Sequence, residues 1–505
     1  MIPPPVQRDL DLFPDDVQPV VPEGLGLDEG GEPIVVAAMN LLNSYAHILV
    51  VAFLVTLLLT PLVRRLAFAG GVVDQPDARR KMHSYPVAYL GGLAVFFGLV
   101  AAIAVSYFTG DEYTAGYPGV PLAVVIGMVA ITFTGLADDV WGTDPRLKIA
   151  GQLVAAAGLA IEQVGVHVAE GLLNPLVLQL MGESGPNVVL FSLGGFDLLS
   201  GHLFYWTGTA LIAIFVLGGC NSANLLDGLD GLLAGVVGIV AVGLLAICLL
   251  MTPSDNAATT QAQETGELVQ QQIKQYHSEK GHYPLGIDEL VDAGYLQADE
   301  ARLPQGWSFS YNSTIGRAAV QGRTLGGARI VLCMALLGAM LGFLPHNFNP
   351  AAIFLGDCGS LLLGYMCVVI ILMLGDRGET HLVFAGLIVF SVPIMDTTLA
   401  IIRRWLAGTP FSVPDSHHIH HQLLGALGGV KRAVLSLYGI SLAFAIVGVT
   451  LAALVMRTGL RVRVVYTIAL VLFSFIGVIA VKAARGQQRR AAEATKAGRT
   501  ENAGR

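Results

Sequence analysis

Long apolar runs, separated by short polar stretches, make up most of the chain. A transmembrane helix needs about 20 apolar residues to cross a bilayer core about 30 Å thick. Runs of this kind predict an all-α polytopic membrane protein with about 11 transmembrane helices. They lie near residues 43–63, 88–108, 119–137, 147–165, 204–220, 229–251, 328–346, 358–375, 381–402, 433–456 and 463–482. The Gly-rich residues 166–203 are assigned neither to a span nor to a domain.

A polar stretch at residues 253–326 interrupts this pattern after the sixth run. Its apolar residues between Val269 and Tyr276 recur at the spacing of a helix face. The expected order is a helix over 264–277, a Gly-x-Tyr-Pro turn, a short helix near 287–291 and a strand near 307–311. We therefore predict a small α+β insertion, and its element order resembles the globular part of type II secretion pseudopilins. The alternative is a small solvated cap without activity.

Composition agrees with a membrane protein. Of 505 residues, 54% are apolar and only 13% are charged, and the mean hydropathy of +0.65 lies well outside the range of soluble proteins. The five cysteines lie in or beside apolar runs and include no Cys-x-x-Cys pair. Neither a disulfide framework nor a thiolate metal site is therefore indicated.

The two ends of the chain differ in charge. Residues 1–32 contain eight acidic residues and one arginine, so residues 1–42 are predicted to be a disordered acidic tail. This tail lacks a basic region followed by an apolar stretch and a cleavage site, which argues against a cleavable signal peptide. Residues 483–505 are predicted to be a basic cytoplasmic tail, and residues 43–252 and 327–482 the two parts of a catalytic domain.

Lysine and arginine concentrate in alternate loops, and such loops are normally cytoplasmic. The residues that define this side are Arg64, Arg65, Arg79, Arg80, Lys81, Arg146, Lys148, Arg403, Arg404, Lys431, Arg432, Lys482, Arg485, Arg489 and Arg490. An odd number of spans then places the amino terminus outside and the carboxyl terminus inside. The same count places the insertion at 253–326 outside the cell.

Every strongly polar cluster falls in a loop assigned to the cytoplasmic side. The clusters contain Lys81 and His83; Asp138, Asp139 and Lys148; Asn221, Asn224, Asp227 and Asp230; Asp357 and Ser360; Asp396; and His417, His418, His420 and His421. Each has an ordinary explanation by itself, such as a solvated helix cap, a tight turn, a topology signal or a structural histidine. Their shared side is the main argument for a functional site.

Carboxylates gathered with lysine and histidine at one membrane face would repel one another unless a divalent cation and an anionic ligand were bound there. Oxygen ligands favour Mg²⁺, with Mn²⁺ as the alternative, and Mg²⁺ commonly completes its coordination with substrate phosphates. The pattern therefore predicts metal-assisted transfer of a phosphoryl-linked group. The chain contains no Gly-x-x-x-x-Gly-Lys-Ser/Thr loop, which argues against an ATP-driven motor.

The motifs resemble those of the polyprenyl-phosphate N-acetylhexosamine-1-phosphate transferases. They are Asp138-Asp139, Asn221-x-x-Asn224-x-x-Asp227-Gly-x-Asp230-Gly, Phe354-Leu-Gly-Asp357-x-Gly-Ser360 and His418-Ile-His420-His421. The His-x-His-His form is similar to the branch that transfers GlcNAc-1-phosphate to undecaprenyl phosphate. The resemblance implies eleven spans in the bacterial inner membrane, a cytoplasmic active site, and transfer from UDP-N-acetylhexosamine to undecaprenyl phosphate with release of UMP for cell-envelope polysaccharide synthesis.

The resemblance also implies roles for individual residues. Asn224 and Asp357 would hold Mg²⁺, and Asp138 and Asp139 would orient or deprotonate the lipid phosphate. Lys148 would contact the diphosphate. Asp227 and Asp230 would line the uridine end. The phosphate-binding wall would be formed by His418, His420 and His421 with Lys81, and His83 would also bind substrate. Whether Asp138 is a base or a covalent nucleophile stays open.

Several positions depart from the family pattern, and two rival functions stay open. Ala88, Tyr89, Cys358, Ser416 and Gln422 replace residues that the family usually has, which leaves the acceptor and the sugar in doubt. One rival is the phospho-MurNAc-pentapeptide transferase of peptidoglycan synthesis. The other is an inactive transporter or scaffold on the same fold. Membrane lipid is an expected partner and nucleic acid is not, whereas a homodimer and a partner for the insertion are left open.

Overall fold

The computed structural model describes residues 34–75, 85–109, 119–193, 196–297, 300–304, 307–313, 315–322, 325–407, 418–458, 461–475, 478 and 481–482. The chain divides into two units, residues 1–44 and residues 45–505. In the first unit the structure describes only the beginning of helix α1 (Ile34–Ala69). The predicted acidic tail up to residue 33, the basic tail and the side chains of Lys81 and His83 lie outside the described residues.

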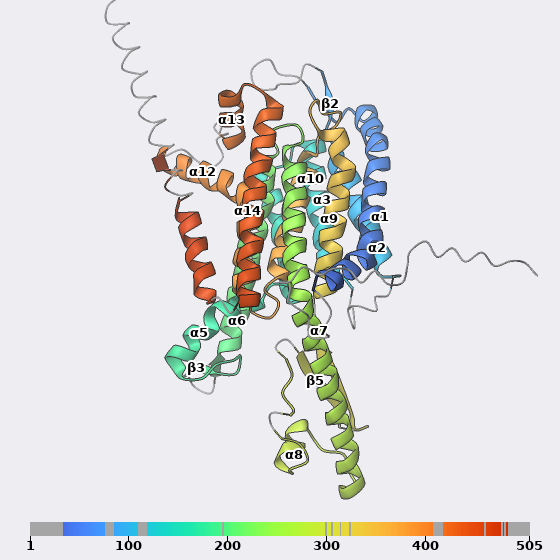
Figure 1. Cartoon of the computed structure of the whole chain (residues 1–505), viewed down its shortest axis with the longest axis vertical. Coiled ribbons are helices and arrows are strands. Elements are labelled where there is room, and N and C mark those ends of the chain that lie inside the picture. The colour runs from blue at the N-terminus through green and yellow to red at the C-terminus, as the bar shows by residue number, and fades with distance from the viewer. Residues whose placement is uncertain are drawn as a thin grey trace, which may run out of the picture. The chain divides into compact units, whose positions relative to one another are not determined.

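Helices account for most of the second unit, in agreement with the predicted class (Figure 1). The rest of α1 is followed by α2 (Gly91–Ser106), α3 (Leu122–Trp141), α4 (Pro145–Ile161), α5 (His167–Met181), α6 (Ser200–Leu226), α7 (Leu232–Lys280), α8 (Ile287–Asp292), α9 (Gly326–Asn347), α10 (Gly356–Met373), α11 (Thr380–Val389), α12 (Ser391–Ala407), α13 (Ile419–Leu427) and α14 (Val430–Thr458). A further apolar helix lies at Val462–Phe475.

Within the described residues, seven helices are long and apolar enough to cross a membrane, or eight if the bent pair Thr380–Val389 and Ser391–Leu406 forms one span. Helices lie at all the predicted spans, but α2, with 16 residues, and Val462–Phe475 are shorter than a full span, and α4 has only 17 residues. The structure therefore supports a polytopic membrane protein without confirming the predicted number of spans.

In the described part of the chain, three short antiparallel strand pairs accompany the helices. Strands β1 (Val73–Asp74) and β2 (Val87–Ala88) form one, and β3 (Val189–Leu193) and β4 (Phe196–Leu199) form the second. The second hairpin and α5 account for most of the residues at 166–203 that sequence left unassigned. Strands β5 (Trp307–Asn312) and β6 (Arg317–Gly322) form the third, with Trp307 opposite Gly322.

Helix α10 packs against α2, α3, α6, α7, α9 and α11, so it lies at the centre of the helices. Close approach at its amino-terminal end depends on glycines in its neighbours. A Cβ atom at Gly92 of α2 would lie 2.2 Å from the Gly359 nitrogen, and one at Gly135 of α3 would lie 2.5 Å from the Cys358 Cα atom. Neither position has room for a side chain. These contacts bring the end of α3 and the start of α10, which carry the predicted carboxylates, together.

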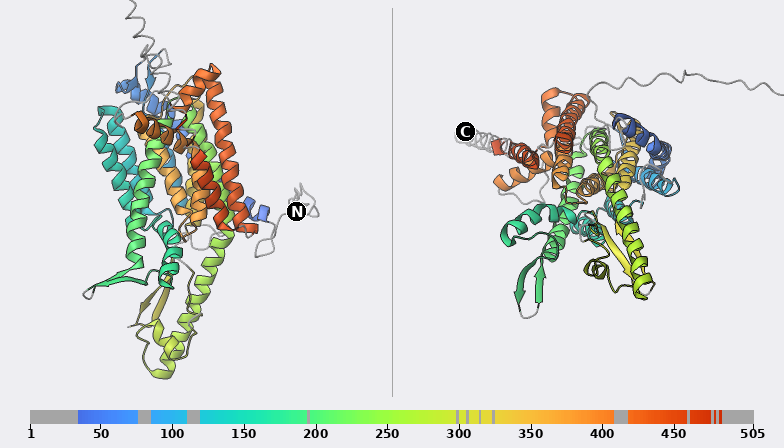
Figure 2. Two further views of the ribbon diagram at one scale, coloured as in Figure 1. Left: turned by 90° about the vertical axis from the view of Figure 1, so that its left-hand side faces the viewer. Right: turned by 60° about the horizontal axis from the view of Figure 1, so that its bottom comes forward.

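Helix α7 is continuous over 49 residues, and in Figure 2 its far part extends beyond the other long helices. At 1.5 Å per residue its length is about 70 Å, more than twice the thickness of a bilayer core. The predicted boundary at residue 253 therefore falls inside a helix, because hydropathy changes there while the backbone hydrogen bonding of the helix continues.

The far part of α7 has a small core of its own with α8 and the β5–β6 hairpin. Val269, Ile273 and Tyr276 are buried together with Leu290 and Leu296, so the predicted helix face does pack inward. The strand predicted near 307–311 is β5. Its partner β6 was not predicted. The pseudopilin resemblance and the external location stay predictions.

Candidate active site

The turn between α3 and α4 places an acidic and a basic side chain side by side. Gly142 caps the carboxyl end of α3 with a left-handed φ of 64°. Asp144 caps the start of α4, where its carboxylate accepts a hydrogen bond of 2.8 Å from the Arg146 backbone nitrogen. This short antiparallel connection brings Lys148 of α4 back beside Asp138 of α3. The Lys148 Nζ atom lies 2.7 Å from Asp138 Oδ2.

Lys148 also contacts a third helix. Its ammonium group donates a hydrogen bond to Asp357 Oδ2 at the start of α10, so two carboxylates meet at one cation. Thr143 donates a 2.8 Å hydrogen bond to the other oxygen of Asp138 and fixes its orientation. Three of the predicted residues, Asp138, Lys148 and Asp357, are thus brought together from widely separated parts of the chain.

Asp139 has a different set of contacts from its neighbour. Its two carboxylate oxygens accept hydrogen bonds from the backbone nitrogens of Asp357 at 2.8 Å and Cys358 at 2.9 Å. These are among the first nitrogens of α10, which have no acceptor within the helix. A carboxylate at a helix amino terminus is also favoured by the helix dipole. Asp139 therefore caps α10 and holds the turn that presents Asp357.

Asn224 joins the same group from the end of α6. Its Nδ2 atom donates to Asp357 Oδ1 at 2.8 Å and to Ser360 Oγ at 2.9 Å. Asn221, one turn earlier in the same motif, instead donates to Gln152 Oε1 of α4 at 3.0 Å. Only the second asparagine of the motif therefore faces the carboxylates.

The two aspartates that follow also differ. Asp230 Oδ2 accepts hydrogen bonds from Asn349 Nδ2 at 2.8 Å and from the Ala351 backbone nitrogen at 3.0 Å, so it anchors the segment before α10. Among the described residues, no side chain donates a hydrogen bond to the Asp227 carboxylate. The pKa of Asp227 is raised to about 7, first by removal from water and then by the negative charges of Asp357 and Asp230. Asp227 is the member of the pair with acceptor capacity to spare.

The histidine motif lies next to this segment. His420 is buried, and a Cβ atom at Gly228 would lie 2.2 Å from its Nε2 atom. Gly228 is therefore required for this contact, because a larger residue would clash with the His420 ring. Burial lowers the pKa of His420 to about 4, against the opposing effect of the Asp396 charge. His420 is thus a neutral link between α13 and the 227–230 segment.

The other two histidines flank this link. The His418 and His420 rings are parallel at 4°, with centroids 5.5 Å apart, and His421 is exposed with its ring 4.3 Å from that of His420. The two parts of the site join through the chain between Asn224, which contacts Asp357, and Gly228, which contacts His420.

Two residues at the site were given no role from the sequence. The backbone around Tyr89 runs beside the segment before α10, since the Phe354 nitrogen donates to Ala88 O and the Gly91 nitrogen donates to Phe354 O, both at 2.8 Å. Burial, followed by the charges of Asp357, Asp227 and Asp139, raises the pKa of the Tyr89 phenol well above its usual range. The second residue is Asp396, which sequence placed in a polar cluster without a role. Its Oδ2 atom lies 2.9 Å from His418 Nδ1.

The donor set resembles a magnesium site more than a zinc site. Within the described residues, no three His, Cys, Asp or Glu side chains are grouped closely enough to hold a metal ion. Two carboxylates, Asp138 and Asp357, converge on the Lys148 ammonium group. Mg²⁺ is typically bound by one or two carboxylates together with substrate phosphates. The Asn224 amide nitrogen faces Asp357, so its oxygen could serve as a ligand only after the amide rotates.

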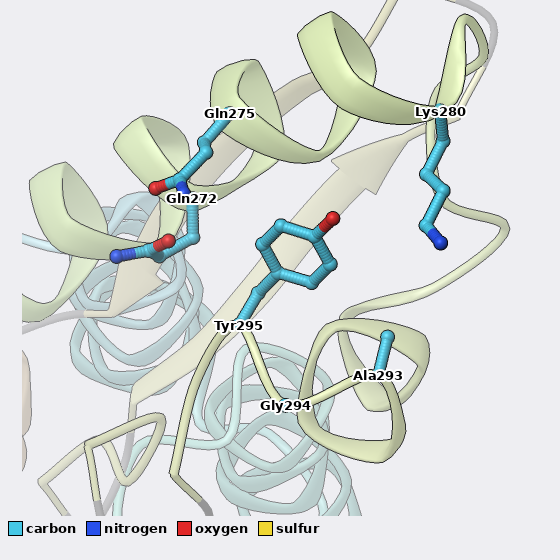
Figure 3. A pocket seen from close by; sticks show the side chains of 6 residues that line it. All are labelled: Gln272, Gln275, Lys280, Ala293, Gly294 and Tyr295. Carbon is cyan, nitrogen blue, oxygen red and sulfur yellow. The ribbon is translucent and has the colours of Figure 1, made fainter.

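Pockets in the far part of α7 offer a contrast. One of about 420 Å³ is lined by Gln272, Gln275 and Lys280 of α7 and by Ala293, Gly294 and Tyr295, whose ring lies between the two sides in Figure 3. The Tyr295 hydroxyl donates to Glu279 Oε2 at 2.6 Å. This pocket has none of the predicted chemistry, which lies at the other end of the same helix.

These helices and their polar ends define a polytopic membrane protein with a site of carboxylates, lysine, asparagine and histidine. The model of glycosyl transferase family 4 matches residues 121–266 and 310–375. A decaprenyl-phosphate N-acetylglucosaminephosphotransferase of Mycolicibacterium smegmatis is 30% identical to this chain, and the match covers 79% of this chain and 79% of the length of that protein. The chain belongs to glycosyl transferase family 4, and the resemblance found in its motifs is confirmed.

Two other relatives bear on the branch. A probable undecaprenyl-phosphate N-acetylglucosaminyl 1-phosphate transferase of Bacillus subtilis is 29% identical over 80% of this chain and 85% of its own. A phospho-N-acetylmuramoyl-pentapeptide-transferase of Bacillus cytotoxicus is 25% identical over 79% of this chain and 95% of its own. The N-acetylglucosamine branch is therefore the more similar of the two.

Proposed function

We propose that this protein transfers N-acetylhexosamine-1-phosphate, most simply GlcNAc-1-phosphate, from a UDP-sugar to undecaprenyl phosphate or a related polyprenyl phosphate. An oxygen of the lipid phosphate attacks the phosphorus attached to the sugar. The bond from that phosphorus to the bridging oxygen breaks, and UMP leaves. The product is a lipid-linked diphosphate sugar for cell-envelope polysaccharide synthesis.

One observation carries this function. Asp138, Lys148, Asp357 and Asn224, from four helices, meet in a single hydrogen-bonded cluster beside the histidine motif. Replacing one phosphoanhydride by another needs little covalent chemistry from the protein. What it needs is the positioning of two polyanions and the neutralisation of their charge. A cluster of this kind, in a chain similar to N-acetylglucosamine phosphotransferases, fits that requirement.

Mg²⁺ is the proposed cofactor, held by Asp357 and, once its amide has rotated, by the side-chain oxygen of Asn224. When bound, it would neutralise the diphosphate and polarise the phosphorus that is attacked. The Lys148 ammonium group lies beside both Asp138 and Asp357. It is therefore placed to contact the diphosphate when the substrate binds there. Asp138, oriented by Thr143, is suited to orient the lipid phosphate or to accept its proton. A phosphate monoester with a pKa near 6 is mostly dianionic at neutral pH, so little base catalysis is needed.

The remaining site residues fit binding roles. Asp227, whose oxygens accept no side-chain hydrogen bond from the described residues, and Asp230 are proposed to line the uridine end. His418, His420 and His421 are proposed to form the phosphate-binding wall, to which Lys81 and His83 would add positive charge. Asp139 contributes by holding the start of α10 in place.

We further propose eleven spans in a bacterial inner membrane, with the site on the cytoplasmic face and residues 253–326 outside. The basic loops identified from the sequence support this orientation. Protease added to intact cells should then cut within 253–326, and protection of that segment would reverse the orientation.

The muramoyl-pentapeptide rival is not favoured, because the relatives with that name are the more distant ones. The scaffold rival is disfavoured by the intact cluster, since unneeded carboxylates at a membrane edge are costly to keep. No contact among the described residues favours either of these two rival functions.

The direct test is a transfer assay. Purified protein would be incubated with Mg²⁺, polyprenyl phosphate and radiolabelled UDP-GlcNAc, followed by extraction of lipid and detection of UMP. We expect label in the lipid phase, loss of transfer on chelation with EDTA, and recovery with added Mg²⁺. The absence of transfer from any UDP-N-acetylhexosamine, under conditions in which an established transferase works, would refute the function.

A further inference from the structure

Asp396 is a buried carboxylate on α12 that the proposed reaction does not yet use. It is 0% exposed, yet both of its oxygens are committed to the segment that carries the histidines. Oδ1 accepts a 2.8 Å hydrogen bond from the Ile419 backbone nitrogen, and Oδ2 lies 2.9 Å from His418 Nδ1. Since an ionised carboxylate can only accept, the proton on this contact belongs to Nδ1 of His418.

These two bonds have distinct structural effects. The Ile419 nitrogen is the first of α13, so Asp396 supplies from another helix the cap that His418 does not provide. The bond to Nδ1 fixes the orientation of the His418 ring. Asp396 Oδ2 also lies 3.9 Å from His420 Nδ1, and His420 in turn packs against Gly228. The start of α13 is therefore held between Asp396 and the 227–230 segment.

We propose that Asp396 is a positioning residue of the transfer reaction, which holds His418 with its Nε2 atom turned away from α12 toward a phosphate oxygen of the substrate. This role rests on the function proposed above. With Nδ1–H donated to Asp396, Nε2 carries a proton only when the ring is positively charged. The carboxylate offsets that charge, so a positively charged His418 can donate a hydrogen bond from Nε2 to a phosphate oxygen without leaving an uncompensated charge in a buried place.

Asp396→Asn is the informative substitution because it keeps size and shape. The amide oxygen can still accept from the Ile419 nitrogen, so the cap of α13 is retained. The amide NH₂ then faces Nδ1 and favours the opposite tautomer of His418, as seen for an Asp→Asn change in the serine protease triad. Helix α13 stays folded while the ring loses its fixed orientation and its counter-charge.

The experiment is a double-mutant cycle on transfer from UDP-GlcNAc to polyprenyl phosphate, with Asp396→Asn, His418→Asn and the double variant. Removing a carboxylate that orients a functional histidine typically costs about 10- to 100-fold. We expect kcat/KM to fall by such a factor in each single variant. The loss should be divided between kcat and KM in the same way in both variants. The double variant should be no worse than His418→Asn alone, because both changes remove one function.

A matched control is Asp376→Asn, which alters another buried carboxylate, the partner of Arg329 beyond the other end of α10. Any loss that it causes should multiply with that of His418→Asn. Asp396→Glu, which keeps the charge on a longer side chain, serves if the asparagine variant does not fold, and it should retain more activity than Asp396→Ala.

The outcomes are distinguishable. If the wild-type protein transfers sugar phosphate and the losses from Asp396→Asn and His418→Asn multiply, or if Asp396→Asn is fully active, the positioning role is refuted while the function stands. If the wild-type protein transfers nothing while an established transferase does, the proposed function fails and the positioning role fails with it.

Discussion

The two ends of α7 are built in opposite ways. At its amino-terminal end, the site is assembled from side chains far apart in sequence, such as Asp138, Asn224 and Asp357. At its carboxyl-terminal end, the small core around Tyr276 and Leu290 comes from a single stretch of chain. The difference teaches that a substitution at the site disturbs several helices at once, whereas one in the far core should act locally.

The largest effect is expected from Asp357→Ala. This change removes the acceptor for both Lys148 and Asn224, together with the central proposed metal ligand. We expect transfer to fall at least about a thousandfold, the upper cost of losing one electrostatic contact at a reacting centre. Transfer assays over a Mg²⁺ series would measure it, with the exposed Asp292→Ala as a control. Full activity would remove Asp357 from the site.

Lys148→Met should have the next largest effect. It leaves the Asp138 and Asp357 carboxylates without the cation between them. It also removes the positive charge that is proposed to contact the diphosphate. We expect kcat/KM to fall by about 100-fold or more. Lys148→Arg should recover part of this loss because it keeps the charge. Equal activity of the methionine and arginine variants would contradict a role for the charge.

Gly228→Ala should have an intermediate effect. The added Cβ atom would lie 2.2 Å from His420 Nε2, so the ring and the start of α13 must shift. Overpacking of this kind typically costs about 1–3 kcal/mol of stability, and we expect about a tenfold loss of transfer. Gly425→Ala, also associated with α13, meets no atom within 4 Å and is the control. Similar losses in both variants would show that the contact with His420 is unimportant.

A smaller effect is expected from pH. The pKa of His420 is about 4 in the folded protein, below the ordinary value of 6.5, so the unfolded chain binds the additional proton between these values. Stability should therefore fall as pH decreases from about 6.5 toward 4. Thermal unfolding in detergent should show a shallower fall for His420→Gln than for the wild type. Parallel curves would mean that the neutral ring contributes nothing.

The smallest effect on transfer is expected from Leu290→Ala. This residue is buried in the far core, and such truncations typically cost about 2–5 kcal/mol. The loss should appear as faster proteolysis within residues 264–322, with transfer in detergent changed by less than about twofold. The exposed Leu285→Ala is the control for proteolysis. A large loss of transfer would show that the two ends of α7 are coupled.

The apolar runs predicted the helical class. The assignment of the polar clusters to one side of the membrane, together with the family resemblance, predicted that Asp138, Lys148, Asn224 and Asp357 belong to one site. These patterns could not separate Asp138 from Asp139. One faces Lys148 and the other caps α10, a distinction that depends on how two helix ends meet.

The same limit explains what sequence missed. Nothing local to Asp396 indicates that it caps α13 or orients His418, since these partners lie more than 20 residues away in the chain. Nothing local to Gly228 indicates that His420 occupies the space beside it. The uninterrupted length of α7 was missed because its polar half was separated from its apolar half by hydropathy alone.

Because α7 is unbroken, the rotation of one of its ends about the helix axis is fixed relative to the other end. Each residue of an α-helix advances the chain by 100°. One residue added to α7 between the apolar half and Val269 would rotate everything beyond it by that angle, so that β6 and α8 would face a different side of the protein. Residues added to the connection after α8 would cause no such rotation. The orientation of the small core around Tyr276 relative to the site is therefore fixed by the length of α7, and residues can be added without changing it only in the loops.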